Sequence, residues 1–224
     1  MNSYQVSFIG KTPLIMHRDN LYFSEKIAEW QKLPENKELS KAGDDRSPAW
    51  TWIGSLYYHK EGRDVICMDS DNLMTVLREG GAKVRTGKKQ ETYKKQTQSG
   101  LVIPEIESTL LVHGKEIPMA PIRALNGETN FMKHMELAEE LGFELFVKRA
   151  RIKSSKHVRV RPMFRDWEIH TQIDVLNEEV SGITKEILTR ILQCAGEQCG
   201  LCDWRPSSRT PGSYGKFSVE IKEI

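Results

Sequence analysis

Hydrophobic and polar residues alternate through the opening of the chain, which predicts that it begins with a strand. Tyr4, Val6 and Phe8 would share one face of a strand over 4–9, because successive side chains of a strand point to opposite sides. The longest stretch with this alternation is 167–176, which predicts a second strand. Further strands are predicted at 50–59, 65–68, 101–103, 110–117, 143–152, 157–164 and 216–224.

Apolar residues spaced three and four apart predict helices between these strands. The clearest runs over 183–195, and a second begins near Thr129 or Asn130 and closes at Gly142. Ser24 is the expected N-cap of a helix that Pro34 stops. A helix capped by Asp69 or Ser70 should end at Gly80-Gly81, and 34–48 is expected to be a surface loop.

Strand–helix–strand order at both ends of the chain indicates the α+β class. It outlines a ferredoxin-like, RNA-recognition-motif-like antiparallel sheet with inserted loops and a basic β-hairpin. At 224 residues the chain suits a single domain, 1–224, with basic insertions at about 83–98 and 146–164.

Composition limits the class of protein further. Charged residues make up 29% and hydrophobic residues 38%, and no apolar run reaches the roughly 20 residues of a membrane span, so no membrane partner is expected. The first residues lack the features of a signal peptide, and the four cysteines without secretory context indicate reduced thiols. We expect a cytoplasmic protein.

Charge is distributed very unevenly along the sequence. Residues 83–98 and 148–165 together hold 14 of the 33 basic residues and one acid, whereas the other 190 residues hold 19 basic and 30 acidic groups, a formal charge of −11. Clustered positive charge on an acidic body repels itself, so it favours a partner that neutralises it. A phosphate backbone is the expected partner, and RNA or single strands are favoured over duplex because no Arg-rich helix suited to reading a groove is evident.

The second stretch also has a geometric pattern. Six of its basic residues and histidines stand at odd-numbered positions, which puts them on one face within each strand. They are Arg149, Arg151, Lys153, His157, Arg159 and Arg161. With a three-residue loop centred on Ser154, Arg151 would lie opposite His157 and Arg149 opposite Arg159. The candidate binding residues here are Arg149, Arg151, Lys153, Lys156, His157, Arg159 and Arg161, and those of the first stretch are Lys88, Lys89, Lys94 and Lys95. A solvated edge hairpin that resists aggregation is the structural alternative.

A glycine-rich loop before the last predicted strand supplies a third group of candidates. Its glycines would let backbone N–H groups approach a phosphate, and its aromatic rings could stack on bases. The residues are Arg205, Arg209, Tyr214 and Lys216. The alternative is a helix-to-strand connection that covers the edge of the core.

Two segments resemble repeat-associated (RAMP) CRISPR proteins. Thr12-Pro13-Leu14-Ile15-Met16-His17 after the first strand is similar to the start of that superfamily. The stretch Gly200…Arg205…Gly212-Ser213-Tyr214-Gly215-Lys216-Phe217 resembles its glycine-rich loop, although 203–206 interrupts the usual spacing. The resemblance covers about 40 residues. It implies a modified RNA-recognition fold that binds guide RNA, either as a Cas7-like backbone subunit or as a mobile-element relative. Implied partners are RNA, further copies along the strand, and CRISPR-type effector subunits, and the basic hairpin would act as a thumb.

Other functions find less support in the sequence. Cys194, Cys199 and Cys202 have the spacing of part of an iron–sulfur site, but no familiar zinc pattern completes a ligand set, and no cofactor is expected. No catalytic motif is present, so we expect no enzyme; His17 is the one candidate base, because some RAMP proteins cut RNA with an early histidine. A protein–protein adaptor whose basic hairpin docks on an acidic partner is the alternative from another class.

Overall fold

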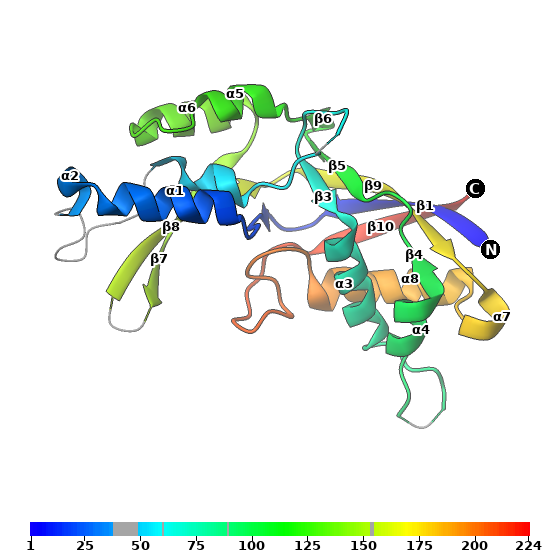
Figure 1. The fold of residues 1–224 in the computed structure, drawn as a ribbon. Coiled ribbons are helices and arrows are strands. Elements are labelled where there is room, and N and C mark those ends of the chain that lie inside the picture. The colour runs from blue at the N-terminus through cyan, green and yellow to red at the C-terminus, as the bar shows by residue number, and fades with distance from the viewer. Residues whose placement is uncertain (38–48, 60, 89, 153–154) are drawn as a thin grey trace. The chain divides into compact units, whose positions relative to one another are not determined.

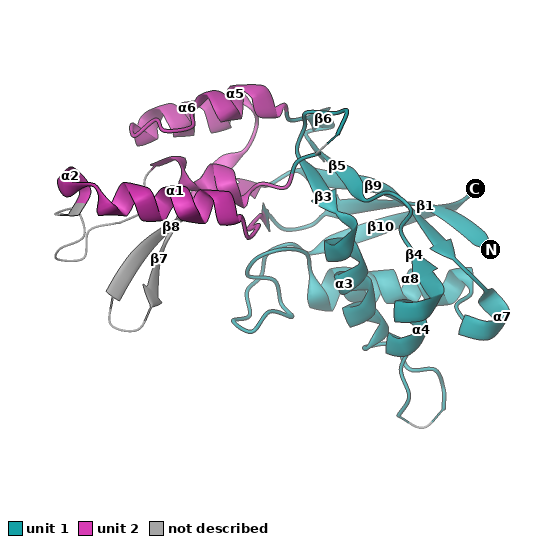
Figure 2. Ribbon diagram, in the orientation of Figure 1, with its two compact units in different colours: residues 1–14, 58–117, 165–224 teal, residues 15–57, 118–164 magenta. Residues whose placement is uncertain are grey.

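The computed structural model describes residues 1–37, 49–59, 61–88, 90–152 and 155–224, with backbone alone at 37, 148–152 and 155–159. These residues form two compact units, each assembled from separate parts of the chain (Figure 2). Unit 1 comprises 1–14, 58–117 and 165–224, and unit 2 comprises 15–57 and 118–164. The two predicted basic insertions therefore fall in different units.

Unit 1 is built on a mostly antiparallel sheet, as the α+β class predicts. Its main strand order is β10-β1-β9-β5-β3, with two short strands, β4 and β6, paired to β9 and β5. The bounds are β1 Asn2–Gly10, β3 Cys67–Asp69, β4 Leu101–Val102, β5 Glu107–Val112, β6 Lys115–Glu116, β9 Trp167–Val175 and β10 Phe217–Glu223.

The predicted alternation holds along the central strands of this sheet. Val6 pairs with Thr171 of β9 on one side and with Ile221 of β10 on the other. Tyr4, Val6 and Phe8 are all buried on one face, which is where the apolar positions of β9 also lie. This face forms the core of unit 1, and its burial supplies the hydrophobic driving force for the sheet.

Two helices, α3 (Ser70–Gly81) and α8 (Lys185–Cys194), lie on the same side of the sheet (Figure 1). Leu73, Val76 and Leu77 of α3 and Leu188, Ile191 and Leu192 of α8 are buried. A π-helical turn, η3 (Ala195–Cys199), extends α8, and the short helices α4 (Lys94–Gly100) and α7 (Glu178–Ser181) complete the unit. The predicted helix over 183–195 is confirmed apart from its first residues.

Gly80 and Gly81 are the last two residues of α3, and they allow it to approach its neighbours closely. A Cβ on Gly80 would lie 2.5 Å from the Ile191 carbonyl oxygen of α8, and one on Gly81 would lie 2.7 Å from the Thr97 side chain of α4. Real Cβ contacts are longer than this, so the spacing of three helices requires glycine at both positions.

Apart from Ile9 and Leu111, the outward positions of the central strands are polar. Glu107, Glu168 and Glu220 lie on this face, together with one lysine, Lys222. His170 is also there, 2.8 Å from the Ser7 hydroxyl. Acidic residues outnumber basic ones at these positions, and no Phe, Tyr or Trp stands at an outward position of β1, β5, β9 or β10.

Unit 2 combines helices with the hairpin β7 (Glu144–Ile152) and β8 (Ser155–Phe164). Ile15 of β2 (Leu14–Ile15) begins the unit, and β2 joins β8 in the sheet order β2-β8-β7. The other elements are α1 Leu21–Lys32, α2 Pro34–Lys37, the 3-10 helix η2 Ala49–Ser55, α5 Met119–Ala124 and α6 Phe131–Glu140.

A buried histidine ties η2 to α6 in the core of unit 2. The Trp52 indole N–H donates to His134 Nδ1 at 3.1 Å, and His134 Nε2 lies 2.8 Å from the Glu128 carbonyl oxygen. Because Nδ1 accepts, the ring proton sits on Nε2 and is donated to that carbonyl. Trp52 also packs against Phe143, whose ring centroid is 5.6 Å away.

Several predicted elements are wrong. Residues 50–59 form the 3-10 helix η2 and one isolated bridge from Tyr58 to Ile66 rather than a strand, because the apolar residues of η2 are buried without alternating. Helix α1 is capped by Asn20, whose side chain accepts the Phe23 N–H, so Ser24 lies inside the helix. By contrast, α3 ends at Gly81 with Asp69 as its N-cap residue, which agrees with the predicted end at Gly80-Gly81. Of the predicted loop 34–48, residues 34–37 are helical and 38–48 lie outside the described residues.

Among the described residues, none of the helices is both long enough and apolar enough to cross a membrane.

Gly80→Ala tests the close approach of α3 to α8. Alanine is the better helix former by about 1 kcal/mol, so propensity alone favours the variant. The 2.5 Å clash with a backbone carbonyl should outweigh this gain, and we expect unfolding free energy to fall by about 2 kcal/mol in urea titration. Arg78→Ala, at an exposed position in the same turn, is the control and should change stability by less than about 0.5 kcal/mol. Stabilisation by Gly80→Ala would contradict the packing argument.

Candidate nucleic-acid interface

The first basic stretch begins in the loop after α3, which we call the basic loop (82–93). It turns back on itself: the Thr86 N–H donates to the Glu91 carbonyl and the Tyr93 N–H to the Val84 carbonyl, each at 3.0 Å. Val84 is buried and anchors the loop to unit 1. The stretch was predicted as a flexible loop or a solvated helix, and it contains both a turn and a helix.

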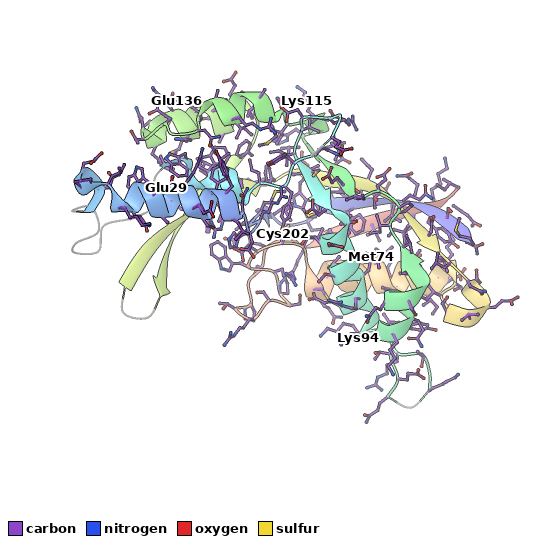
Figure 3. All side chains as sticks on the ribbon, viewed as in Figure 1. Glu29, Met74, Lys94, Lys115, Glu136 and Cys202 are labelled. Carbon is purple, nitrogen blue, oxygen red and sulfur yellow. The ribbon has the colours of Figure 1, made fainter. Side chains whose placement is uncertain are left out.

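That helix, α4, is held against α3 by its one-sided composition. Thr97 is fully buried, and its hydroxyl lies 2.8 Å from the Lys94 carbonyl. Gly100 is also buried, whereas Lys94, Lys95 and Gln98 are exposed. The helix therefore carries its cations on an anchored element, with Lys94 at its first position (Figure 3).

The cations of this stretch are open to solvent. Lys83, Arg85, Lys88, Lys94 and Lys95 are all exposed, and none forms an ion pair with another described residue. Lys89 lies outside the described residues. Five cations with no internal counter-charge form a surface that attracts anions.

In the glycine-rich loop (200–216), the glycine N–H groups bond within the protein, whereas the sequence predicted that they would approach a phosphate. The N–H groups of Gly200, Gly212 and Gly215 donate to the carbonyls of Ala195, Arg205 and Pro13 respectively. A Cβ on Gly212 or Gly215 would lie 2.0 Å from a carbonyl oxygen of Trp204 or Leu201. The glycines thus allow the chain to pack on itself, and the expectation that these N–H groups are available to a phosphate is wrong.

Arg205 fixes the glycine-rich loop to α3. Its Nη2 donates to Glu79 at 2.9 Å and its Nη1 donates to the Cys202 carbonyl at 3.1 Å. The Ser207 hydroxyl also lies 2.5 Å from Glu79. Arg205, predicted to bind nucleic acid, therefore has its charge offset inside unit 1 and positions the loop.

The other three candidates in this loop are differently placed. Arg209 is exposed and Lys216 is half-buried. The Tyr214 ring packs beside Trp204, with centroids 6.4 Å apart. Arg209 is thus an accessible cation, whereas the ring of Tyr214 packs against another residue of the same loop.

A pocket of about 510 Å³ joins the basic stretch to the glycine-rich loop, although the two are more than 100 residues apart in sequence. We call it the α3–α4 pocket. Its lining residues are Arg78, Glu79, Ala82, Lys83, Lys94, Gln98, Cys199 and Ser207. Sequence reasoning missed Arg78, Glu79 and Ser207, for which the only local signal is the position of the first two in the last turn of α3.

The second basic stretch forms the predicted hairpin, but in another register. Arg151 pairs with Lys156 and Lys148 pairs with Arg159, because the turn leaves only residues 153–154 outside the two strands. The predicted pairs, Arg151 with His157 and Arg149 with Arg159, are therefore wrong. Lys153 and the side chains of Arg149, Arg151, Lys156, His157 and Arg159 lie outside the described residues.

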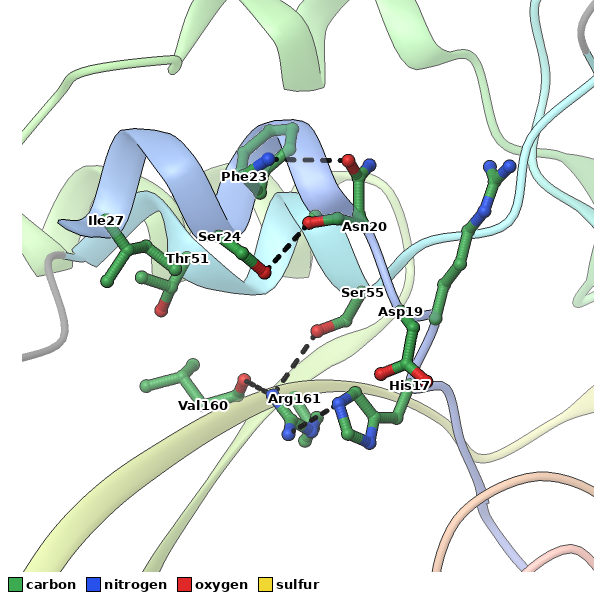
Figure 4. Close-up of a pocket in the computed structure, with 12 residues that line it drawn as sticks. His17, Asp19, Asn20, Phe23, Ser24, Ile27, Thr51, Ser55, Val160 and Arg161 are labelled. Carbon is green, nitrogen blue, oxygen red and sulfur yellow. Dashed lines mark hydrogen bonds between the residues drawn. The ribbon is translucent and has the colours of Figure 1, made fainter. Parts of the chain in front are cut away.

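Arg161 is buried, with 8% of its surface exposed, and borders a separate pocket of about 260 Å³ in unit 2 (Figure 4). One guanidinium nitrogen lies 3.3 Å from the Ser55 hydroxyl, and the other lies 3.0 Å from His17 Nε2. Since a guanidinium only donates, His17 Nε2 accepts this hydrogen bond. The nitrogen that a catalytic base would use is thus occupied, and His17 is exposed.

The cysteines do not assemble into a ligand set. Among the described residues, no three His, Cys, Asp or Glu side chains are placed to hold one metal ion, and all four cysteines are free thiols. Burial raises the pKa of the Cys199 thiol to about 11 and that of Cys202 to about 12. Thiols that stay protonated in this way behave as packing groups.

No protein-family model matches the chain, and no significant match was found among curated proteins.

Cys199 and Cys202 should resist alkylation in the folded protein. At pH 9 a thiol of pKa about 11 is ionised on the order of one part in a hundred, and the burial of Cys199 also blocks the reagent. Iodoacetamide labelling read by peptide mass spectrometry should therefore be at least tenfold slower at both sites than in guanidinium chloride, where the pKa returns to about 8.5. Equal rates in the folded and unfolded chain would contradict the assigned burial.

Proposed function

We propose that this chain binds RNA or another single-stranded nucleic acid, with the basic surface of unit 1 as one contact region. The observation that carries the proposal is the set of exposed cations over 83–95 that have no ion-pair partner among the described residues. Lys and Arg at such a surface gain most from phosphate, because each contact releases counterions from the nucleic acid.

The distribution of charge over unit 1 favours the helix side as the binding side. The open face of the sheet presents Glu168 and Glu220, which repel a phosphate backbone. It also lacks the aromatic residues on which an RNA-recognition sheet stacks bases. Binding through α4 and the basic loop, rather than across the sheet, is consistent with both features.

The order of elements in unit 1 supports the proposal at the level of fold. Along the chain β1, α3, β5, β9, α8 and β10 follow the β-α-β-β-α-β order of a ferredoxin-like motif. Strand β9 lies between β1 and β5 and is antiparallel to both, which is a split βαβ arrangement. We propose on this basis, and on the resemblance of residues 12–17 and 212–217, a RAMP-like fold.

The hairpin of unit 2 is proposed as a second contact region. Its register places two like-charged pairs opposite each other, Lys148 with Arg159 and Arg151 with Lys156. Residues 148–165 hold eight basic residues and no acid, which supports a polyanionic partner.

Charge reversal on the basic surface should weaken RNA binding. The test variant is Lys88→Glu/Lys94→Glu/Lys95→Glu, and the control Lys11→Glu/Lys115→Glu/Lys222→Glu makes the same change in net charge at exposed lysines elsewhere in unit 1. The test variant should lose at least tenfold in affinity for single-stranded RNA by fluorescence anisotropy. Its salt slope should fall by about 2, at roughly 0.7 per phosphate contact.

Two outcomes would reject the proposal. One is the absence of any RNA or DNA binding tighter than about micromolar at roughly 50 mM salt. The other is equal loss from the test and control variants, since net charge alone would then account for binding. Binding to poly-glutamate but not to RNA would instead identify an adaptor that docks on acidic protein surfaces.

Assembly of several protein copies along one nucleic-acid strand is a separate prediction of the proposed RAMP-like fold. Head-to-tail contacts do not close, so longer strands should recruit further copies in steps. Light scattering of the protein with RNAs of increasing length measures this. A constant stoichiometry, or a closed dimer formed without RNA, would exclude the filament.

A further inference from the structure

The α3–α4 pocket has the charge of an anion site. Three of its lining residues are cations, Arg78, Lys83 and Lys94, and all three are exposed and form no ion pair with the described residues. They come from the last turn of α3, the basic loop and the first position of α4.

The one acid in the lining does not cancel this charge. Glu79 accepts hydrogen bonds from Arg205 at 2.9 Å and from the Ser207 hydroxyl at 2.5 Å. Its charge is therefore offset by Arg205, which does not itself line the pocket. The pocket keeps the positive charge of its three cations, and Gln98 adds an amide donor.

The rest of the lining argues against a seat for a base. Ala82 and Cys199 are its apolar members, and no aromatic side chain lines it. Stacking on aromatic rings is the usual means of holding an unpaired base. The volume of about 510 Å³ is ample for a phosphate group with its attached sugar.

We propose that the α3–α4 pocket binds a phosphate monoester, such as the terminal phosphate of a nucleic-acid strand, independently of base sequence. A monoester carries about −1.5 to −2 charge at pH 7, against −1 for an internal phosphodiester, so it matches a site with three cations better. This inference rests on the proposed function, because the bound strand would bring its end to the pocket from the adjoining basic surface.

The test compares RNAs of about ten nucleotides that differ only at their ends, a length typical of single-strand sites. A 5′-phosphate, a 3′-phosphate and hydroxyl ends form the three arms, and affinity is measured by anisotropy with an internal label. We expect one phosphorylated arm to bind about tenfold tighter than the hydroxyl arm, since the pocket adds a few charge-assisted hydrogen bonds. The arm that gains identifies the end that the pocket takes.

Variants assign the gain to the pocket. Arg78→Gln should abolish the difference in affinity between phosphorylated and hydroxyl ends while the hydroxyl-ended RNA still binds. Lys83→Gln should also abolish this difference, but it should weaken the hydroxyl-ended RNA as well, because Lys83 belongs to the basic surface. Lys88→Gln and Lys95→Gln, at cations that do not line the pocket, should weaken every RNA equally and keep the difference. If Arg78 and Lys83 serve only to stabilise the end of α3, their replacement lowers the melting temperature. The difference in affinity between phosphorylated and hydroxyl ends then stays unchanged, and the inference is wrong.

The two proposals fail in distinguishable ways. Equal affinity for all three ends overturns the pocket assignment and leaves RNA binding intact. If no RNA binds, the proposed function fails, and millimolar inorganic phosphate then tests the pocket alone by its effect on the melting temperature. A rise in the wild type that Arg78→Gln removes supports the pocket, and no rise overturns it.

Discussion

The last turn of α3 determines the arrangement on the helix side of unit 1. Four consecutive residues face four different neighbours: Arg78 lines the α3–α4 pocket, Glu79 holds the glycine-rich loop, Gly80 contacts α8 and Gly81 contacts α4. Two helices can approach α3 from different sides only because neither glycine carries a side chain. The cations of 83–95 are therefore displayed on elements whose positions depend on this single turn.

This arrangement separates two kinds of cation. Arg205 is bonded to an acid and a carbonyl, so its energetic contribution goes to positioning the glycine-rich loop. Arg78, Lys83 and Lys94 lack such partners among the described residues and keep their charge available. The distinction matters because a charge that is already paired gains little from a phosphate, whereas an unpaired one gains the full interaction.

Local patterns explain why some of this was predictable and some was not. The strands expected over 4–9 and 167–176 were predictable because alternation there coincides with burial on one face. The strand predicted over 50–59 was wrong because a short apolar run fits a strand and a buried helix equally well. The hairpin register failed by one residue because it depends on the exact loop length, and the meeting of Glu79 with Arg205 joins residues 126 apart, which no local pattern records.

The polarity of unit 1 also gives a physical reason for an oriented complex. An acidic sheet face and a basic helix side create opposite potentials on one small unit, so a strand approaching within the screening distance of roughly 8 Å is repelled from one and drawn to the other. In the proposed complex, this field would orient the strand before any specific contact forms. In the complex proposed above, the N–H groups of Gly200, Gly212 and Gly215 are already used internally and would offer no phosphate site, which favours the surface around α4 as the contact region of unit 1.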